Sequence, residues 1–165
     1  RYVVQEAFSK HIFGSENMNF KGVSVTFDCK DGAQYEAIGQ FWDMMTQQYP
    51  KSTLIGLGHS WSNDQIDYAI GSEDLSREYD CKEIRAIYPP AGLLQMRLPD
   101  EGWLEYHGKL EDLTKLYEKI YEDGPLTYEI ESFDDDGNAD IRIFRRPYVE
   151  PVSKKKPPMF MRKRT

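Results

Sequence analysis

Two glutamates on one predicted strand are the residues of this chain best suited to chemistry. Residues 126–133 (LTYEIESF) predict a strand, and alternation along a strand places Glu129 and Glu131 on the same face. A carboxylate among aromatic rings can serve as counter-ion for an organic cation or, with its pKa raised by burial, as a general base. The plainer alternative is a pair of solvent-exposed acids. The sequence leaves open whether Glu129 or Glu131 would face a pocket.

Aromatic side chains make up 13% of the chain and supply candidate walls for such a pocket. For any single ring, packing in the core is the plainer alternative, because tryptophan and tyrosine bury large apolar areas wherever they lie. We expect a pocket role for Trp103, whose strand runs from the turn at Pro99 to Gly108. The predicted ligand-binding residues are Trp42, Tyr68, Trp103, Tyr106, Glu129 and Phe144.

Other chemistries lack their motifs. Residues 58–62 (GHSWS) lack the final glycine of a nucleophile elbow and lead into a turn and a strand, whereas the elbow opens a helix. The calcium-loop pattern that begins at Ser132 has Ile143 where the bidentate glutamate belongs. The three histidines have no metal-binding spacing, and glycine-rich nucleotide loops are absent from the sequence. We therefore predict no catalytic residue, no metal and no cofactor.

The elements that position these residues repeat in order. Apolar residues at helical spacing predict helices over 34–49 and 110–121, which end at Pro50 and at Gly124-Pro125. Strands are expected over 53–59, 65–71, 103–107, 126–133 and 139–144. A first strand is expected to begin near Tyr2, and residues 22–27 either continue it or form a separate edge strand. Residues 83–88 are a possible extra strand.

Strand, helix, strand, strand thus occurs twice, over about 2–71 and 93–145. The expected fold is α+β, a duplicated βαββ unit with pseudo-twofold symmetry. It has an antiparallel sheet, two helices on one face and a ligand groove between the repeats.

Charge is unevenly distributed along the chain. The formal net charge is −7, but residues 153–165 contain six basic residues and no acid, so the remainder carries −13. An acidic body repels phosphate backbones and attracts cations, so we expect a cationic ligand and no direct binding of nucleic acid. We predict one domain over 1–150 and a disordered basic tail over 151–165. The sequence shows no membrane span or signal pattern, the two cysteines are expected to be reduced thiols, and a cytoplasmic location is expected.

Several short segments, in their order and spacing, resemble the GyrI-like small-molecule-binding domain. This is the effector-binding module of AraC-type and MerR-type bacterial transcription regulators, which also occurs as a stand-alone protein. The segments that carry the resemblance are Tyr2-Val3-Val4 through Phe8 to Gly14, Phe41-Trp42, residues 67–71 (DYAIG), Leu98-Pro99 through residues 103–106 (WLEY) to Gly108, residues 119–121 (KIY) and Tyr128-Glu129. Residues 80–92 are longer than the usual link of that family. The last strand ends in Arg145-Arg146-Pro147, and Glu131 stands where the family tends to have an aromatic residue.

The resemblance implies the same duplicated fold, with SHS2-like repeats, and a ligand in the groove between them. It implies Glu129 as the central acid, with Tyr68, Trp103 and Tyr106 as wall. The implied function is a sensor that binds an apolar cation, as in multidrug recognition, and signals to a fused or partner DNA-binding domain. Two alternatives remain open: hydrolysis of reactive cyclopropane-bearing compounds, and a gyrase-inhibitor-like protein-binding module.

Overall fold

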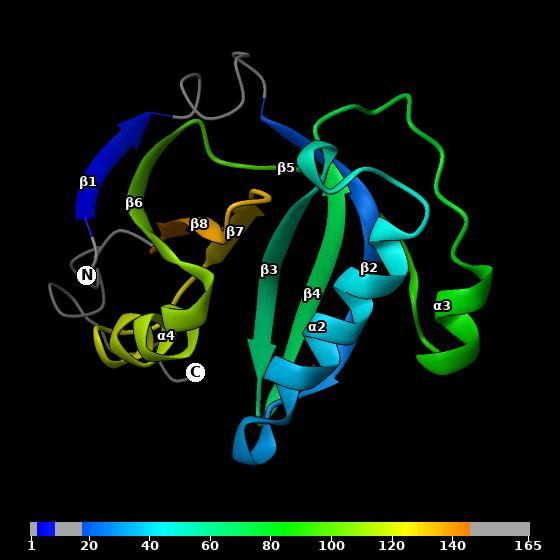
Figure 1. The fold of residues 1–165 in the computed structure, drawn as a ribbon, viewed down its shortest axis with the longest axis horizontal. Coiled ribbons are helices and arrows are strands. Elements are labelled where there is room, and N and C mark those ends of the chain that lie inside the picture. Colours follow the sequence, from blue (N-terminus) through cyan, green and yellow to red (C-terminus); the bar gives the residue numbers. More distant parts are fainter. Residues whose placement is uncertain (1–2, 9–17, 146–165) are drawn as a thin grey trace, which may run out of the picture.

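One antiparallel sheet carries two main helices, each within one of two successive units of the chain (Figure 1). The computed structural model describes residues 3–8 and 18–145, so the predicted tail at 151–165 lies outside the described residues. The first unit contains β1 (Val3–Phe8), β2 (Asn19–Asp28), the 3-10 turn η1 (Lys30–Gly32), α2 (Ala33–Thr46), the 3-10 turn η2 (Lys51–Thr53), β3 (Ile55–Ser62) and β4 (Gln65–Ser72). The second contains β5 (Gly92–Arg97), β6 (Glu101–Lys109), η3 (Leu110–Asp112), α4 (Leu113–Glu122), β7 (Tyr128–Phe133) and β8 (Asn138–Phe144). The short helix α3 (Lys82–Ile87) connects the units.

The order of strands confirms the predicted duplication. It is β1-β6-β8-β7-β3-β4-β2-β5, with every neighbouring pair antiparallel. The order is symmetric about the central pair of β7 and β3 when the two units are exchanged. The first strand of each unit pairs with the other unit, β1 with β6 and β5 with β2. These two crossing strands tie the units together at both edges of the sheet.

Both helices cover the same face of the sheet, as predicted. Helix α2 buries Phe41 and Met45 in a cluster that includes the β2 residues Val23, Val25 and Phe27. Helix α4 buries Leu116, Tyr117 and Ile120 in a cluster with the β8 residues Ala139, Ile141 and Ile143. The strand registers place the residues buried under α2 and those buried under α4 on the same face of the sheet. The centre of the sheet, at β3 and β7, therefore lies between the two helices.

The opposite face of the sheet has an apolar cluster of its own. Alternation along the strands turns Leu57, Ala69 and Ile130 away from the helices, and they pack with Trp103. Phe20, Met18 and Leu98 complete this cluster. The sheet therefore has apolar clusters on both faces.

Three expectations about local structure need correction or completion. Residues 83–88, a possible strand, are largely helical in α3, where Ile84 is buried among exposed neighbours and the Lys82 backbone N–H bonds the Asp80 carboxylate at 2.9 Å. The two β-rich pieces near the N-terminus are separate strands, β1 and β2, rather than one bulged strand. Helix α2 ends at Thr46 rather than Tyr49.

Within the described residues, no helix is both long and apolar enough to cross a membrane.

Candidate functional site

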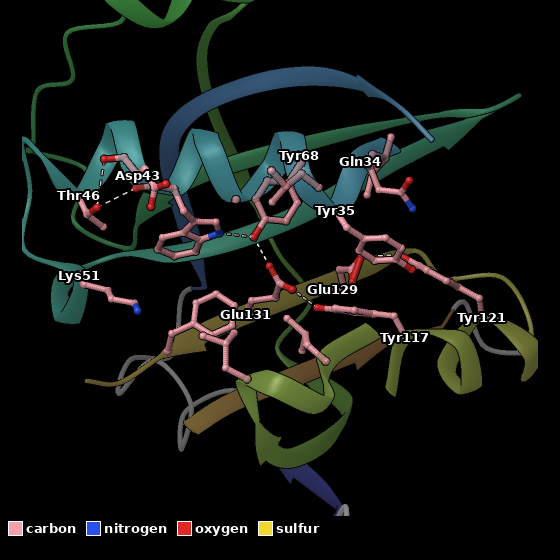
Figure 2. Close-up of a pocket in the computed structure, with 17 residues that line it drawn as sticks. Gln34, Tyr35, Asp43, Thr46, Lys51, Tyr68, Tyr117, Tyr121, Glu129 and Glu131 are labelled. Atoms are coloured by element: carbon pink, nitrogen blue, oxygen red, sulfur yellow. Dashed lines mark hydrogen bonds between the residues drawn. The ribbon is translucent and has the colours of Figure 1, made fainter. Parts of the chain in front are cut away.

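A cavity of about 310 Å³ lies between α2 and α4, above the centre of the sheet (Figure 2). Its floor includes Glu129, Glu131 and Phe133 of β7 together with Tyr68 of β4. Figure 2 shows Tyr35 of α2 and Tyr121 of α4 near Glu129, whereas Lys51 lies toward the other end of the cavity. The predicted groove between the repeats thus corresponds to a described pocket.

The two glutamates reach the pocket because of strand alternation and because β3 beside them lacks side chains at the matching positions. Gly58 pairs with Glu129, and Gly56 pairs with Glu131. A Cβ atom at Gly58 would lie 2.8 Å from the Cγ of Glu129, and one at Gly56 would lie 2.0 Å from the hydroxyl of Tyr68. Both glycines therefore leave the space in which the acidic and phenolic side chains lie.

We expect Gly58→Ala to lower the free energy of unfolding by about 1–3 kcal/mol, the usual cost of overpacking, because the new methyl group overlaps Glu129. Gly92→Ala is the matched control, since no neighbouring atom lies within 4 Å of the methyl group it would add. Denaturant unfolding of both variants measures the difference. Equal effects of the two substitutions would show that Gly58 is not needed to accommodate Glu129.

Four aromatic side chains hold the carboxylates in place. The indole N–H of Trp42 donates to the hydroxyl of Tyr68 at 2.8 Å, and that hydroxyl donates to one oxygen of Glu131. The hydroxyl of Tyr117 donates to the other oxygen of Glu131. The hydroxyl of Tyr121 donates to Glu129 at 3.1 Å. Each glutamate thus has its own phenolic donor or donors.

Burial shifts the ionisation of both acids. Glu129 is 2% exposed and Glu131 is 5% exposed. Burial, and then the charge of Glu131, raises the pKa of Glu129 to about 8, although hydrogen bonds from Tyr121 and Tyr117 oppose the rise. Burial also raises the pKa of Glu131, against hydrogen bonds from Tyr117 and Tyr68. Glu129 therefore holds a proton for much of the time at neutral pH, and a nearby cation would displace it.

Aromatic rings flank the acids at both ends of the pocket. Tyr117 and Tyr121 are stacked, with ring centroids 5.9 Å apart and an interplanar angle of 21°. Trp42 meets Phe133 edge to face at 5.1 Å. The Nζ of Lys51 lies 5.8 Å from the centroid of the Phe133 ring. The walls are thus suited to an apolar ligand, and Lys51 lies toward the end of the pocket away from Glu129.

Three of the predicted site residues, Trp42, Tyr68 and Glu129, line this pocket. Glu131, which the sequence left undecided against Glu129, lines it as well. The α4 tyrosines, Tyr117 and Tyr121, also line the pocket, although they are not among the residues predicted from the sequence. Their spacing of four along the predicted helix, opposite a strand with two acids, was the available signal.

The structure places the other three predicted residues outside the pocket. Trp103 is fully buried in the cluster on the opposite face, where its ring centroid lies 5.6 Å from that of Phe144. Alternation along β6 turns Trp103 away from the helices. Tyr106 does face the helices, but it is buried beneath α4 with Leu116. The expectation that Trp103 forms a pocket wall is therefore corrected, because its strand lies beyond β8 and presents that residue to the other side.

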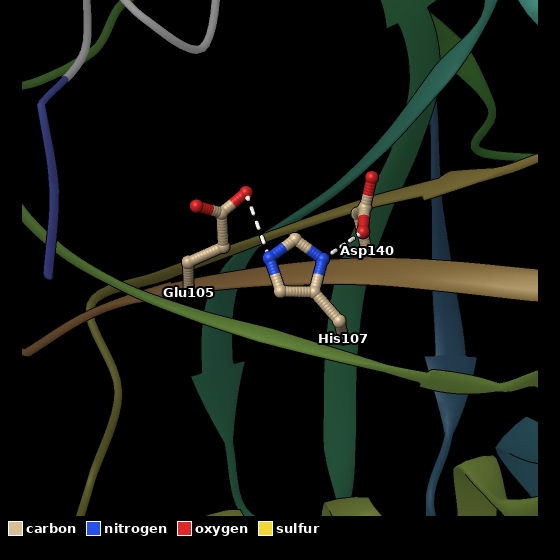
Figure 3. A group of neighbouring side chains, drawn as sticks. All are labelled: Glu105, His107 and Asp140. Carbon is tan, nitrogen blue, oxygen red and sulfur yellow. Dashed lines mark hydrogen bonds and ion pairs between the residues drawn. The ribbon is translucent and has the colours of Figure 1, made fainter. Parts of the chain in front are cut away.

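Glu105, His107 and Asp140 form a second group of ionisable side chains (Figure 3). They alternate along β6 and β8 with Tyr106 and Ile141, which pack under α4, so the group lies on the face opposite the helices. The Nδ1 of His107 contacts Asp140, and its Nε2 lies 3.5 Å from Glu105. Arg142 also bonds Glu105, at 2.6 Å. The donor types suit a divalent metal, but the two carboxylates contact different ring nitrogens and the guanidinium already balances Glu105. The absence of a bound metal stays a prediction.

Comparisons with known proteins reveal a likeness of fold. No known family profile matches the sequence, and no curated protein sequence matches it. An integron cassette protein from Vibrio cholerae superposes with a TM-score of 0.51 at 13% identity, over 88% of this chain and 95% of the other. A Staphylococcus aureus protein with a proposed role in bacterial transcription regulation superposes with a TM-score of 0.50 at 10% identity, over 87% of this chain and 96% of the other.

The structure of SAV2435 bound to tetraphenylphosphonium also superposes, with a TM-score of 0.50 at 11% identity, over 93% of this chain and 96% of the other. These matches span nearly the whole length of each similar protein. The likeness agrees with the strand order and the helix placement described above. The chain therefore has the GyrI-like fold that its sequence resembles.

Proposed function

We propose that this chain is a binding domain for an apolar, cationic small molecule, held between α2 and α4. The observation that carries the proposal is the pair of buried carboxylates at the floor of an aromatic pocket. Among the described residues, neither Glu129 nor Glu131 forms an ion pair. Burial of acids without a cation is costly, so such a pair favours a ligand that brings positive charge.

The aromatic walls support the same ligand class. Rings of Tyr35, Tyr117 and Tyr121 lie around the end of the pocket that contains Glu129, and a cation over such rings gains electrostatic attraction in addition to apolar contact. A structural neighbour was solved with the organic cation tetraphenylphosphonium. That neighbour makes tetraphenylphosphonium a suitable first probe.

The biological role that fits this ligand is that of a sensor in bacterial transcription regulation or multidrug recognition. Occupancy of the pocket would draw α2 and α4 toward the same molecule, and a fused or partner DNA-binding domain could respond to that change. The neighbour from Staphylococcus aureus with a proposed role in transcription regulation supports this role.

The test is a titration of the parent and Glu129→Gln with tetraphenylphosphonium, followed by tryptophan fluorescence, because Trp42 lines the pocket. We expect the parent to bind and the variant to bind at least about tenfold more weakly, since loss of one charge partner commonly costs more than about 1.4 kcal/mol. Glu83→Gln makes the same replacement of a carboxyl group by an amide at an exposed site on α3, and it should keep the parent affinity. Absence of binding by the parent, or equal affinity in all three proteins, would refute the proposal.

One observation favours a second candidate, a hydrolase. A carboxyl group with a pKa of about 8 beside a cavity is suited to accept a proton from water near neutral pH. Reactive cyclopropane-bearing esters or related electrophiles would be the substrates to assay. Product in excess of one equivalent per protein, lost in Glu129→Gln, would favour the hydrolase over the sensor.

A further inference from the structure

The floor of the cavity contains two buried acids, and this number carries information about the ligand. We propose that the pocket prefers a ligand with two positively charged nitrogens, one for each glutamate, over a singly charged ligand of the same shape. This inference rests on the proposed function, since it specifies the cation that the same pocket binds.

The geometry gives each carboxylate a separate position. Glu129 and Glu131 are two residues apart on β7, which places their Cα atoms about 6.6 Å apart along the same face. Tyr121 bonds Glu129, while Tyr68 and Tyr117 bond the two oxygens of Glu131. Because the two carboxylates are held at separate positions along β7, two charged groups of one ligand can be bound at different points.

The charge around the acids is unbalanced. Asp43 and Lys51 are the other acidic and basic residues that line the cavity, and Lys51 is held over the ring of Phe133 rather than against a glutamate. One positive charge from a ligand would compensate one carboxylate and leave the other protonated or unpaired. A second positive charge would compensate both in the same apolar surroundings.

A third acceptor lies at the same end of the pocket. The Oε1 of Gln34 is buried, and it has no hydrogen-bond partner among the described residues. Figure 2 shows Gln34 beside Tyr35, on the α2 side of Glu129. An ammonium or amidinium group donates several N–H bonds and accepts none, so it matches the acceptors at the Glu129 end of the pocket.

The experiment compares two probes with the same ring, 1,4-bis(aminomethyl)benzene and 4-methylbenzylamine, by calorimetry at pH 7. The first has two ammonium groups, and in the second one of them is replaced by hydrogen. We expect the diamine to bind at least about tenfold more tightly to the parent. In both Glu129→Gln and Glu131→Gln the preference should fall to about twofold or less, whereas Glu83→Gln should retain it.

Titrations in buffers of different ionisation enthalpy add a second readout. Diamine binding to the parent should release protons, because Glu129 must ionise, and binding to Glu129→Gln should release fewer. If Glu131→Gln fails to fold, the Glu129→Gln comparison and the proton count still decide the question.

The outcomes separate the two proposals. Tetraphenylphosphonium binding together with equal affinities for the diamine and the monoamine would overturn the inference and leave the proposed function standing. Failure of all three probes to bind would overturn both. A preference for the diamine that persists in Glu129→Gln and Glu131→Gln would also overturn the inference, since the second charge would then be recognised elsewhere.

Discussion

Trp103→Ala is expected to lower the free energy of unfolding by about 3–5 kcal/mol, the usual cost of removing a fully buried large aromatic side chain. Trp103 is completely buried in the cluster on the face opposite the helices, where its ring lies near those of Tyr128 and Phe144. Its indole N–H also donates to the Pro99 carbonyl at 3.1 Å, so the substitution removes a hydrogen bond as well. Urea denaturation of the purified variant measures the loss.

Tyr35→Ala is the control, because Tyr35 is 37% exposed and lines the pocket instead. Tyr35→Ala should cost no more than about 1 kcal/mol of stability and should weaken binding of tetraphenylphosphonium. Trp103→Ala, assayed at a temperature where it remains folded, should keep most of the affinity. A stable Trp103→Ala protein that no longer binds the cation would restore Trp103 to the binding site.

The stability of the parent protein is expected to fall as pH rises from about 5 to 9. The pKa of Glu129 is about 8 in the folded protein against an ordinary value of 4.5, so the folded state binds more protons across this range. The stabilising contribution of the protonated acid is complete below about pH 4.5 and is lost as pH rises through 8. One pKa unit corresponds to about 1.4 kcal/mol, so the loss is on the order of 4 kcal/mol.

Glu129→Gln should remove much of this pH dependence, because the amide has the shape of the carboxyl group and does not ionise. The variant should melt at a higher temperature than the parent at pH 9, by roughly 10 °C. Glu83→Gln should follow the parent at every pH. Parallel melting curves for the parent and Glu129→Gln between pH 5 and 9 would contradict the buried, raised-pKa state of this acid.

The sequence predicted the framework of the pocket because periodicity is local. Alternation placed Glu129 and Glu131 on one face, and helical spacing identified the α2 residues that include Trp42. The repeated order of elements then predicted a groove at the centre of the sheet. The contact of Tyr68 with Glu131 was beyond such rules, because it depends on Gly56 on a strand that lies between them.

Pairing between strands far apart in the sequence explains why the position of Trp103 was predicted wrongly. Trp103 was expected near the seam between the repeats, but β6 is separated from β7 by β8, and only the complete strand order shows this. The exchange of β1 and β5 between the units is likewise a long-range pairing that no local pattern specifies. Residues 83–88 carry too few apolar positions to distinguish one turn of helix from a short strand.

The proposed function requires the cavity between α2 and α4 to bind an organic cation against Glu129 and Glu131. A crystal structure of the parent protein with tetraphenylphosphonium is the decisive measurement. We expect density for the phosphonium between the two helices, with Glu129 or Glu131 as the nearest acid and Tyr121 among the ring contacts. Density for the cation in another hollow, such as the one bounded by His59 and Thr127, would contradict it.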